Sequence, residues 1–241
     1  MKSTKKALCV AVALLLALSC VMLTGCGAKN EVKGIGTAKT TQPQQTAAPT
    51  TAPAATDDSA ETLPVNGYKK PYTGTSKTVE IDVKDYGKIT VELDSKTAPL
   101  TVQNFLNLVN EGFYDGLTFH RIIKGFMVQG GDPQGTGMGG STNQIKGEFA
   151  SNGVINNIKH VRGVISMARS SAPNSASSQF FIMHQDAPHL DGEYAAFGKV
   201  TSGMEVVDKL AETAKVEDAN GTVAKANQPV ITSIKILENS D

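Results

Sequence analysis

The chain has 241 residues with 23 basic and 23 acidic side chains, so its formal net charge is zero. Nucleic-acid binders usually carry a basic stripe, and we therefore expect no nucleic-acid partner. The length allows one or two domains. All three cysteines, Cys9, Cys20 and Cys26, lie near the N-terminus. The remainder must fold without disulfides, which a domain of about 165 residues is large enough to do.

The first 25 residues have the form of a signal peptide. Three lysines precede a 17-residue apolar run from Ala7 to Leu23. The tetrad LTGC ending at Cys26 resembles a bacterial lipobox, which implies cleavage after residue 25 and a lipid on Cys26. An uncleaved transmembrane anchor is the alternative, but the run is short of the roughly 20 residues of a span. We expect a lipoprotein anchored in the cell membrane through Cys26, on its extracytoplasmic face.

Residues 26–76 are dominated by threonine, alanine, proline and glutamine and contain few bulky apolar side chains. Such a segment buries too little surface to offset the entropy of ordering it, so we expect disorder. Its expected role is a tether between the lipid and a folded domain at residues 77–241. About 50 residues span roughly 40 Å as a coil and about 150 Å when taut. A low-complexity segment without function is the alternative.

The folded domain begins with a predicted hairpin. Thr78–Val83 and Lys88–Leu93 alternate polar and apolar residues on either side of a short turn. A helix should follow, with Pro99 in its first turn, an apolar stripe and an end at Gly112. Residues 119–132 then indicate two short strands joined at Gly125.

Four further strands are predicted, at Gly163–Ala168, Gln179–Met183, Ala195–Val200 and Val230–Leu237. A second helix should begin at Ser202, where Ser202 and Glu205 have the spacing of a capping box. About eight strands with two helices suggest a barrel or sandwich closed by helices.

Several motifs are weak. Residues 135–140 (GTGMGG) satisfy G-x-G-x-x-G, but no helical stripe follows, and the residue 20 positions on is His160 rather than an acid. A glycine loop beside a peptide groove fits better than a phosphate site.

The histidines lack metal-ligand spacing, so we expect no metal. Ser178, His184 and Asp186 could form a hydrolase triad only on paper, because no nucleophile elbow surrounds a serine.

The segment FHRIIKGFMVQGGD, Phe119–Asp132, places Arg121 among aromatic residues and a methionine. Composition alone favours an exposed arginine over a donor aimed into an apolar pocket. Together with GTGMGG, SSQFFIMH and LDGEYAAFGKV in this order, however, the segment closely resembles the cyclophilin family of peptidyl-prolyl cis-trans isomerases, from about Thr78 to Glu238. The resemblance implies a mainly β fold: an eight-stranded antiparallel closed barrel capped by two α-helices, with the site on its outer face.

The resemblance also implies accelerated rotation of X-Pro peptide bonds in exported proteins, without a cofactor. Arg121 would be the catalytic donor to the prolyl nitrogen, whose lone pair becomes available only when the amide twists. Proline-containing polypeptides are the expected partners of a monomer. A proline-binding or chaperone module with incidental catalysis is the alternative, although simple proline binding needs no donor at the nitrogen. The implied substrate-binding residues are Phe126, Met127, Gln129, Ala168, Arg169, Ser170, Gln179, Phe181, His189, Leu190 and Tyr194.

Three positions depart from the best-known eukaryotic pattern. His189 stands where those members carry tryptophan, Tyr194 where they carry the site histidine, and Arg169 where an asparagine is familiar. These changes leave the proline pocket in place. They predict weak binding of cyclosporin, because the tryptophan supplies a hydrogen bond and a large contact face.

Overall fold

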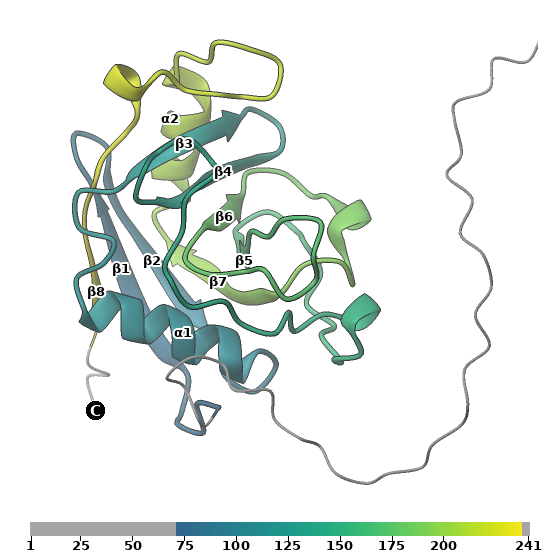
Figure 1. Cartoon of the computed structure of the whole chain (residues 1–241). Helices are drawn as coiled ribbons and strands as arrows, with labels where there is room; N and C mark the ends of the chain where they lie inside the picture. Colours follow the sequence, from purple (N-terminus) through teal and green to yellow (C-terminus); the bar gives the residue numbers. More distant parts are fainter. Residues whose placement is uncertain (1–70, 238–241) are drawn as a thin grey trace, which may run out of the picture. The chain divides into compact units, whose positions relative to one another are not determined.

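The computed structural model describes residues 71–237 (Figure 1). The predicted signal peptide, Cys26 and most of the predicted tether lie outside this range. The described part of the tether, residues 71–76, is attached to the domain: the Tyr72 amide donates to the Pro99 carbonyl at 3.3 Å, and the Ser95 hydroxyl donates to the Gly74 carbonyl at 3.1 Å. Within residues 71–237, no helix is long and apolar enough to cross a membrane.

The described chain contains eight strands, two α-helices and three short 3-10 helices. The strands are β1 (Lys77–Val83), β2 (Gly87–Leu93), β3 (Thr118–Ile123), β4 (Met127–Asp132), β5 (Val164–Met167), β6 (Phe180–Met183), β7 (Ala196–Ser202) and β8 (Ile231–Leu237). The helices are α1 (Pro99–Asn110) and α2 (Met204–Thr213), with 3-10 turns at Ala150–Asn152, Pro188–Leu190 and Lys225–Asn227.

All eight strands form one antiparallel sheet in the order β3-β4-β6-β5-β7-β2-β1-β8. The sheet curls until its end strands meet, where Thr118 forms a bridge with Val230 and the Ile231 amide donates to the Leu117 carbonyl at 2.7 Å. The two α-helices lie at opposite ends of this curled sheet (Figure 1). The predicted eight-stranded antiparallel fold with two helices is therefore confirmed.

The rest of the outer edge of β3 is paired by a loop, residues 216–223, rather than by β8. Arg121 forms a bridge with Thr222, the Val223 amide donates to the His120 carbonyl at 3.0 Å, and the Ile122 amide donates to the Gly221 carbonyl at 2.8 Å. Backbone groups of an edge strand need such partners when they are buried. The seam of the barrel is thus completed by a loop, and this loop lies beside Arg121.

The main core lies inside the curl, where α1 packs through Phe105. The Phe105 ring lies 5.1 Å from that of Tyr114, 5.3 Å from Phe197 and 5.6 Å from Phe180, measured between centroids. A second, smaller apolar cluster includes Met127, Phe181 and Leu190. Of the three ring contacts of Phe105, the one with Phe180 is edge to face, which is a favourable arrangement beyond the burial of apolar surface. The smaller cluster matters for function because part of it faces a cavity.

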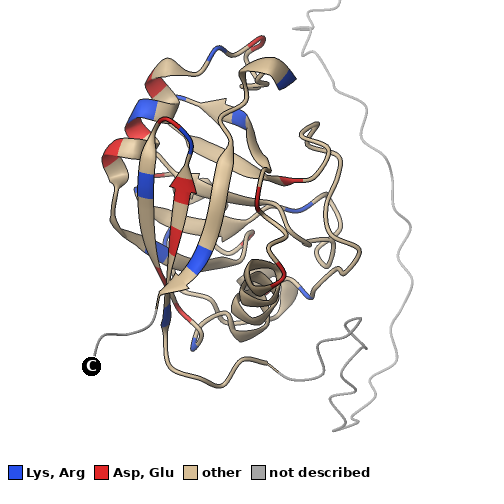
Figure 2. Ribbon diagram, turned by 90° about the vertical axis from the view of Figure 1, so that its left-hand side faces the viewer, with Lys and Arg blue, Asp and Glu red and all other residues tan. Residues whose placement is uncertain are grey.

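Strands β1, β2 and β8 together carry charged residues of both signs (Figure 2). Glu80 on β1 lies opposite Lys235 on β8, and its carboxylate accepts from the Lys88 ammonium of β2 at 2.7 Å. Opposite charges across neighbouring strands are favourable, although exposed pairs contribute little to stability. This part of the sheet is a solvated face.

The helix boundaries follow local backbone chemistry, with one correction. As predicted, α1 has Pro99 at its start, and Gly112 follows its end with a φ of +65°. The predicted capping box at Ser202 and Glu205 is wrong, because Ser202 still belongs to β7 and pairs with Thr90. Helix α2 instead begins after Gly203, whose φ is +88°, without a side-chain cap. A Cβ atom at Gly203 would collide with the Lys88 carbonyl oxygen, so this tight turn requires glycine.

The cap of α1 comes from a residue far along the chain. The buried carboxylate of Glu148 accepts from the amides of Leu100 at 3.0 Å and Thr101 at 2.8 Å, and from the Thr101 hydroxyl at 2.6 Å. A helix N-terminus has unpaired amides and favours a negative charge. Burial raises the pKa of Glu148, and these hydrogen bonds oppose that shift. Glu148 therefore fixes α1 to the segment before the first 3-10 helix.

We expect Glu148→Ala to lower the free energy of unfolding by about 1–3 kcal/mol, because it leaves buried donors at the start of α1 without an acceptor. Urea denaturation followed by circular dichroism measures this change. Glu92→Ala, which removes an exposed carboxylate from β2, is the matched control and should change the value by less than about 0.5 kcal/mol. Equal stability of the two variants would contradict a capping role for Glu148.

Candidate active site

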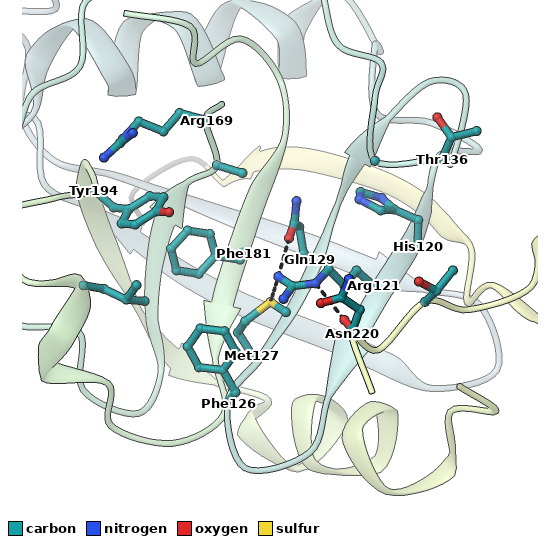
Figure 3. A pocket seen from close by; sticks show the side chains of 15 residues that line it. His120, Arg121, Phe126, Met127, Gln129, Thr136, Arg169, Phe181, Tyr194 and Asn220 are labelled. Carbon is teal, nitrogen blue, oxygen red and sulfur yellow. Dashed lines mark hydrogen bonds between the residues drawn. The ribbon is translucent and has the colours of Figure 1, made fainter. Parts of the chain in front are cut away.

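A cavity of about 460 Å³ opens beside β3, β4 and β6 (Figure 3). One part of its lining is mainly apolar and consists of Phe126, Met127, Ala168, Phe181, Leu190 and Tyr194, with Arg169 over the Tyr194 ring. The other part is polar and consists of His120, Gly135, Thr136, Gly137, Asn220 and Thr222. Arg121 and Gln129 lie between the two parts (Figure 3). The cavity thus combines an apolar pocket with a polar groove.

Arg121 is fixed by its neighbours rather than extended into solvent. Its Nε donates to the Asn220 carbonyl at 2.8 Å, and its Nη1 donates to Gln129 Oε1 at 3.2 Å and lies 4.0 Å from Met127 Sδ. Among the described residues, Nη2 has no hydrogen-bond partner. The exposed arginine favoured by composition alone is therefore wrong, because β3 directs this half-buried side chain into the cavity. Burial lowers the pKa of Arg121, yet an arginine remains charged at every physiological pH.

A pair of glutamines connects Arg121 to the glycine loop, residues 135–140. Gln129 Nε2 donates to Gln179 Oε1 at 2.9 Å, which leaves the Gln129 oxygen for Arg121. Gln179 Nε2 in turn donates to the carbonyls of Gly137 at 3.0 Å and Gly139 at 2.6 Å. Gln179 therefore positions both Gln129 and the glycine loop.

The glycine loop is anchored by the carboxylate of Asp132. It accepts the backbone amides of Gln134 at 2.8 Å, Thr136 at 2.9 Å and Gly137 at 2.6 Å. Burial alone would raise the pKa of Asp132, but these backbone hydrogen bonds together lower it. The loop opens no helix and borders the cavity, as expected for a loop beside a peptide groove rather than a phosphate site.

Aromatic contacts connect residues of the apolar pocket to one another and to their neighbours. Phe181 meets Tyr194 edge to face, with centroids 5.8 Å apart. His189 stacks on Phe126 at 5.7 Å but does not line the cavity itself. The guanidinium of Arg169 lies 4.7 Å from the centroid of the Tyr194 ring, and its Nε donates to the Glu193 carbonyl at 2.9 Å. These contacts hold the pocket wall in one arrangement.

Most residues predicted for the site come together in the cavity. Arg121 and eight of the eleven predicted substrate-binding residues line it. The other three, Ser170, Gln179 and His189, do not line it. Ser170 belongs to a neighbouring loop, where its amide donates to the Ser175 hydroxyl at 2.9 Å.

His120, which was not predicted from the sequence, also lines the cavity. Phe119 pairs with Gly130 and Arg121 pairs with Gln129, so His120 is an extra residue in a β-bulge. In a regular strand neighbouring side chains point to opposite faces, whereas here His120 and Arg121 both reach the cavity. His120 is 4% exposed, and among the described residues its ring nitrogens have no hydrogen-bond partner. Burial lowers its pKa, so the imidazole is neutral at pH 7.

The loop residues Asn220 and Thr222 were also missed. They reach the cavity because the loop at 216–223 pairs with the edge of β3, about 100 positions earlier in the chain. Periodicity and short motifs contain no information on such a long-range pairing. No sequence pattern that we considered could therefore have placed Asn220 at the site.

The hydrolase triad rejected from the sequence is also absent from the described structure. Ser178 Oγ donates to the Gly131 carbonyl, while His184 Nδ1 accepts the Gly125 amide, so the two side chains have unrelated partners. Asp186 accepts the amide of Arg162.

A different serine and histidine do meet. His160 contacts the Ser166 hydroxyl at 3.1 Å and the Asp191 carboxylate at 3.1 Å. Ser166 is fully buried, so it is unavailable to a substrate as a nucleophile. The His160 ring stacks with Phe181 at 6.1 Å, which makes this group a support of the pocket wall.

Comparison with known proteins agrees with this geometry. The family model described as "Cyclophilin type peptidyl-prolyl cis-trans isomerase/CLD" matches residues 78–238. A peptidyl-prolyl cis-trans isomerase of Helicobacter pylori is 46% identical over 152 residues, which cover 62% of this chain and 90% of that protein. Peptidyl-prolyl cis-trans isomerase B of Bacillus subtilis is 49% identical over 129 residues, covering 54% and 87%.

Solved structures give the same result for the fold. A crystal structure of a cyclophilin-type peptidyl-prolyl cis-trans isomerase from Cryptosporidium parvum matches with a TM-score of 0.61 and 34% identity, covering 69% of this chain and all of that one. A structure of the same protein in the presence of the dipeptide Ala-Pro matches with a TM-score of 0.59 and 36% identity, covering 67% and 99%. The family match includes the curled sheet and the whole cavity lining, and the chain therefore belongs to the cyclophilin-type peptidyl-prolyl cis-trans isomerase family.

Proposed function

We propose that this chain catalyses rotation about X-Pro peptide bonds in polypeptides that bind the cavity. The observation that carries the proposal is the position of Arg121, a permanent cation between an apolar pocket and a polar groove. The apolar part fits a pyrrolidine ring, and the polar part suits the peptide backbone next to it. The other arginine of the lining, Arg169, lies over the Tyr194 ring instead.

The chemistry needs no covalent intermediate. A planar amide delocalises the nitrogen lone pair, and the resulting barrier to rotation is about 18–20 kcal/mol. When the bond twists, the lone pair returns to the nitrogen and becomes a hydrogen-bond acceptor. A donor N–H of Arg121 placed at that nitrogen then binds the twisted state more strongly than the planar one, which lowers the barrier.

The surroundings of Arg121 make this donor effective. The Asn220 carbonyl and Gln129 hold two of its nitrogens, so little reorganisation accompanies the reaction. Phe126, Met127 and Phe181 exclude water from one side, and an electrostatic interaction is stronger in such a setting than in water. His120 remains neutral and adds no competing charge beside the cation.

The smallest expected ligand is an Ala-Pro dipeptide. The solved relative was crystallised in the presence of Ala-Pro. We extend that chemistry to this chain because we expect its apolar pocket to bind a proline ring that is preceded in the peptide by a residue with a short side chain. Longer clients would lie along the groove between Gln129 and the glycine loop.

The place of action follows from the N-terminal sequence. The basic residues, the apolar run and the LTGC tetrad support export and attachment of a lipid to Cys26. We therefore place the isomerase on the extracytoplasmic face of the cell membrane, where it assists the folding of exported proteins. One chain supplies the complete cavity lining, which is consistent with a monomer.

Replacing Arg121 tests the catalytic role. We expect Arg121→Ala to lower kcat/KM by about 100- to 1,000-fold, the usual effect of removing one transition-state donor, while peptide binding changes little. Proline cis-trans exchange in an Ala-Pro-Phe peptide, followed by NMR, measures the rate. Arg162→Ala is the control, because that arginine pairs with Asp208 away from the cavity. Near-native exchange in Arg121→Ala, or binding without acceleration by the unaltered chain, would instead make this a proline-binding module.

The pH profile tests the assigned charges. Arg121 stays charged and His120 stays neutral, so kcat/KM should vary less than about twofold between roughly pH 6.5 and 8.5. Burial lowers the pKa of His120 and His160 in the folded chain. Below about pH 6.5 these two histidines are therefore protonated more readily in the unfolded chain than in the folded chain. The free energy of unfolding should therefore fall as the pH falls. A rate profile with an inflection near neutral pH would contradict this assignment.

The membrane anchor is tested separately. Cys26→Ser should abolish incorporation of radiolabelled palmitate, because the thiol of Cys26 carries the lipid. It should also stop cleavage after residue 25, so the variant keeps its signal peptide and migrates as the longer precursor. Cys20→Ser, in the predicted signal peptide, is the control. Continued labelling of Cys26→Ser would exclude lipidation at this position.

A further inference from the structure

We propose that His184 is a positioning residue of the proline pocket: its imidazole holds the turn that carries Phe126, and the pocket binds a proline ring poorly when this hold is lost. The inference rests on the proposed function, since it explains how the same pocket keeps its shape. His184 is not among the residues that line the cavity, so it acts through Phe126 and not on the substrate.

His184 binds both ends of the dipeptide Gly125-Phe126. The antiparallel pairing of β4 with β6 ends at Met127 and Met183, and His184 is the next residue after β6. Its backbone amide donates to the Phe126 carbonyl at 2.9 Å. Its side chain binds the other end, because Nδ1 accepts the backbone amide of Gly125 at 3.0 Å.

The turn between β3 and β4 has little else to restrain it at Gly125. This glycine is exposed and has a φ of +83°, and a Cβ atom built on it would meet nothing within 4 Å. The Phe126 amide closes the turn on the Ile123 carbonyl at 3.0 Å, but that bond lies within the turn itself. Because glycine has unusual backbone freedom, the bond from its amide to His184 is what fixes this part of the turn to β6.

The imidazole is itself held in place. The His184 side chain is 9% exposed, and its Nε2 lies 3.5 Å from the Asp208 carboxylate of α2. Since Nδ1 accepts an N–H, it carries no proton, and the neutral ring therefore has its proton on Nε2, facing Asp208. Helix α2 thus favours the tautomer in which the acceptor nitrogen is directed at Gly125.

The position of the turn matters because Phe126 belongs to the apolar pocket (Figure 3). Its ring is half-buried and stacks on His189, with centroids 5.7 Å apart. A partly exposed ring is not enclosed by packing on all sides, so its place depends on the backbone that carries it. A turn that moves away from β6 would carry one wall of the pocket with it.

This role predicts a particular kinetic change. The pocket wall contacts the proline ring in the planar and in the twisted state alike, and loss of such uniform binding raises KM while kcat stays unchanged. Arg121 keeps its partners Asn220 and Gln129, neither of which lies in the turn, so the donor to the prolyl nitrogen is unaffected.

The experiment compares His184→Leu with His184→Asn, two side chains of similar size of which only asparagine has an acceptor oxygen near the place of Nδ1. His184→Leu should raise KM for an Ala-Pro-Phe peptide about tenfold, as expected when one hydrogen bond is lost, with kcat within about twofold of the unaltered chain. His184→Asn should keep KM within about threefold. Proline exchange followed by NMR at increasing peptide concentration gives both constants. Lys124→Ala, which removes an exposed side chain from the same turn, is the control and should change neither.

The separation of KM from kcat distinguishes positioning from mere support of the fold. Partial unfolding reduces the number of active molecules, which lowers the apparent kcat and leaves KM unchanged. That result for His184→Leu, or an equal KM in the leucine and asparagine variants, would overturn the inference and leave the proposed function intact. Failure of the unaltered chain to accelerate exchange would overturn the proposed function, and the dissociation constants of both variants for the peptide would then still test the hold on Phe126.

A second measurement needs no variant. In the ¹⁵N-labelled chain at about pH 8.5, above the ordinary titration range of histidine, the imidazole spectrum of His184 should show a proton on Nε2 alone. The Gly125 amide nitrogen should show a scalar coupling to Nδ1 through the hydrogen bond. A proton on Nδ1 would overturn the inference, because that nitrogen could not then accept the Gly125 amide.

Discussion

The pairing of β3 with the loop at residues 216–223 is the interaction on which the site depends. It completes the seam of the curled sheet, and it presents the Asn220 carbonyl to Arg121 Nε at 2.8 Å. The same strand contains the bulge at His120, which turns two consecutive side chains toward the cavity. The same pairing therefore closes the sheet and orients the proposed catalytic cation, and a change in the loop would affect both.

Much of the fold could be predicted because local sequence patterns determine where many of its strands and helices begin and end. Alternation located the hairpin of β1 and β2, Pro99 and Gly112 marked the ends of α1, and Gly125 marked the turn between β3 and β4. The start of α2 was missed because a tertiary contact decided it: β7 continues through Ser202, and Gly203 must pass close to the backbone of β2. Propensity and capping rules yield to such contacts.

The site residues likewise fall into a group that local sequence patterns predicted and a group that depends on tertiary contacts. The residues around β3, β4 and β6 were predicted from motifs that follow one another in the chain, and most of them line the cavity. His120 was missed because a bulge reverses the alternation that the analysis assumed. Asn220 was missed because its only connection to Arg121 is a pairing across 99 positions. Gln179 was found, and the structure adds that its side chain orients Gln129.

Arg169 and Tyr194, which both depart from the familiar pattern, belong together as a pair. The guanidinium of Arg169 covers the Tyr194 ring and donates to the Glu193 carbonyl, so these two residues of the cavity lining hold each other in place. Tyr194 in turn meets Phe181 edge to face. Tyr194, which is larger than the familiar histidine, is thus held by Arg169, which is larger than the familiar asparagine. The pocket keeps its apolar character.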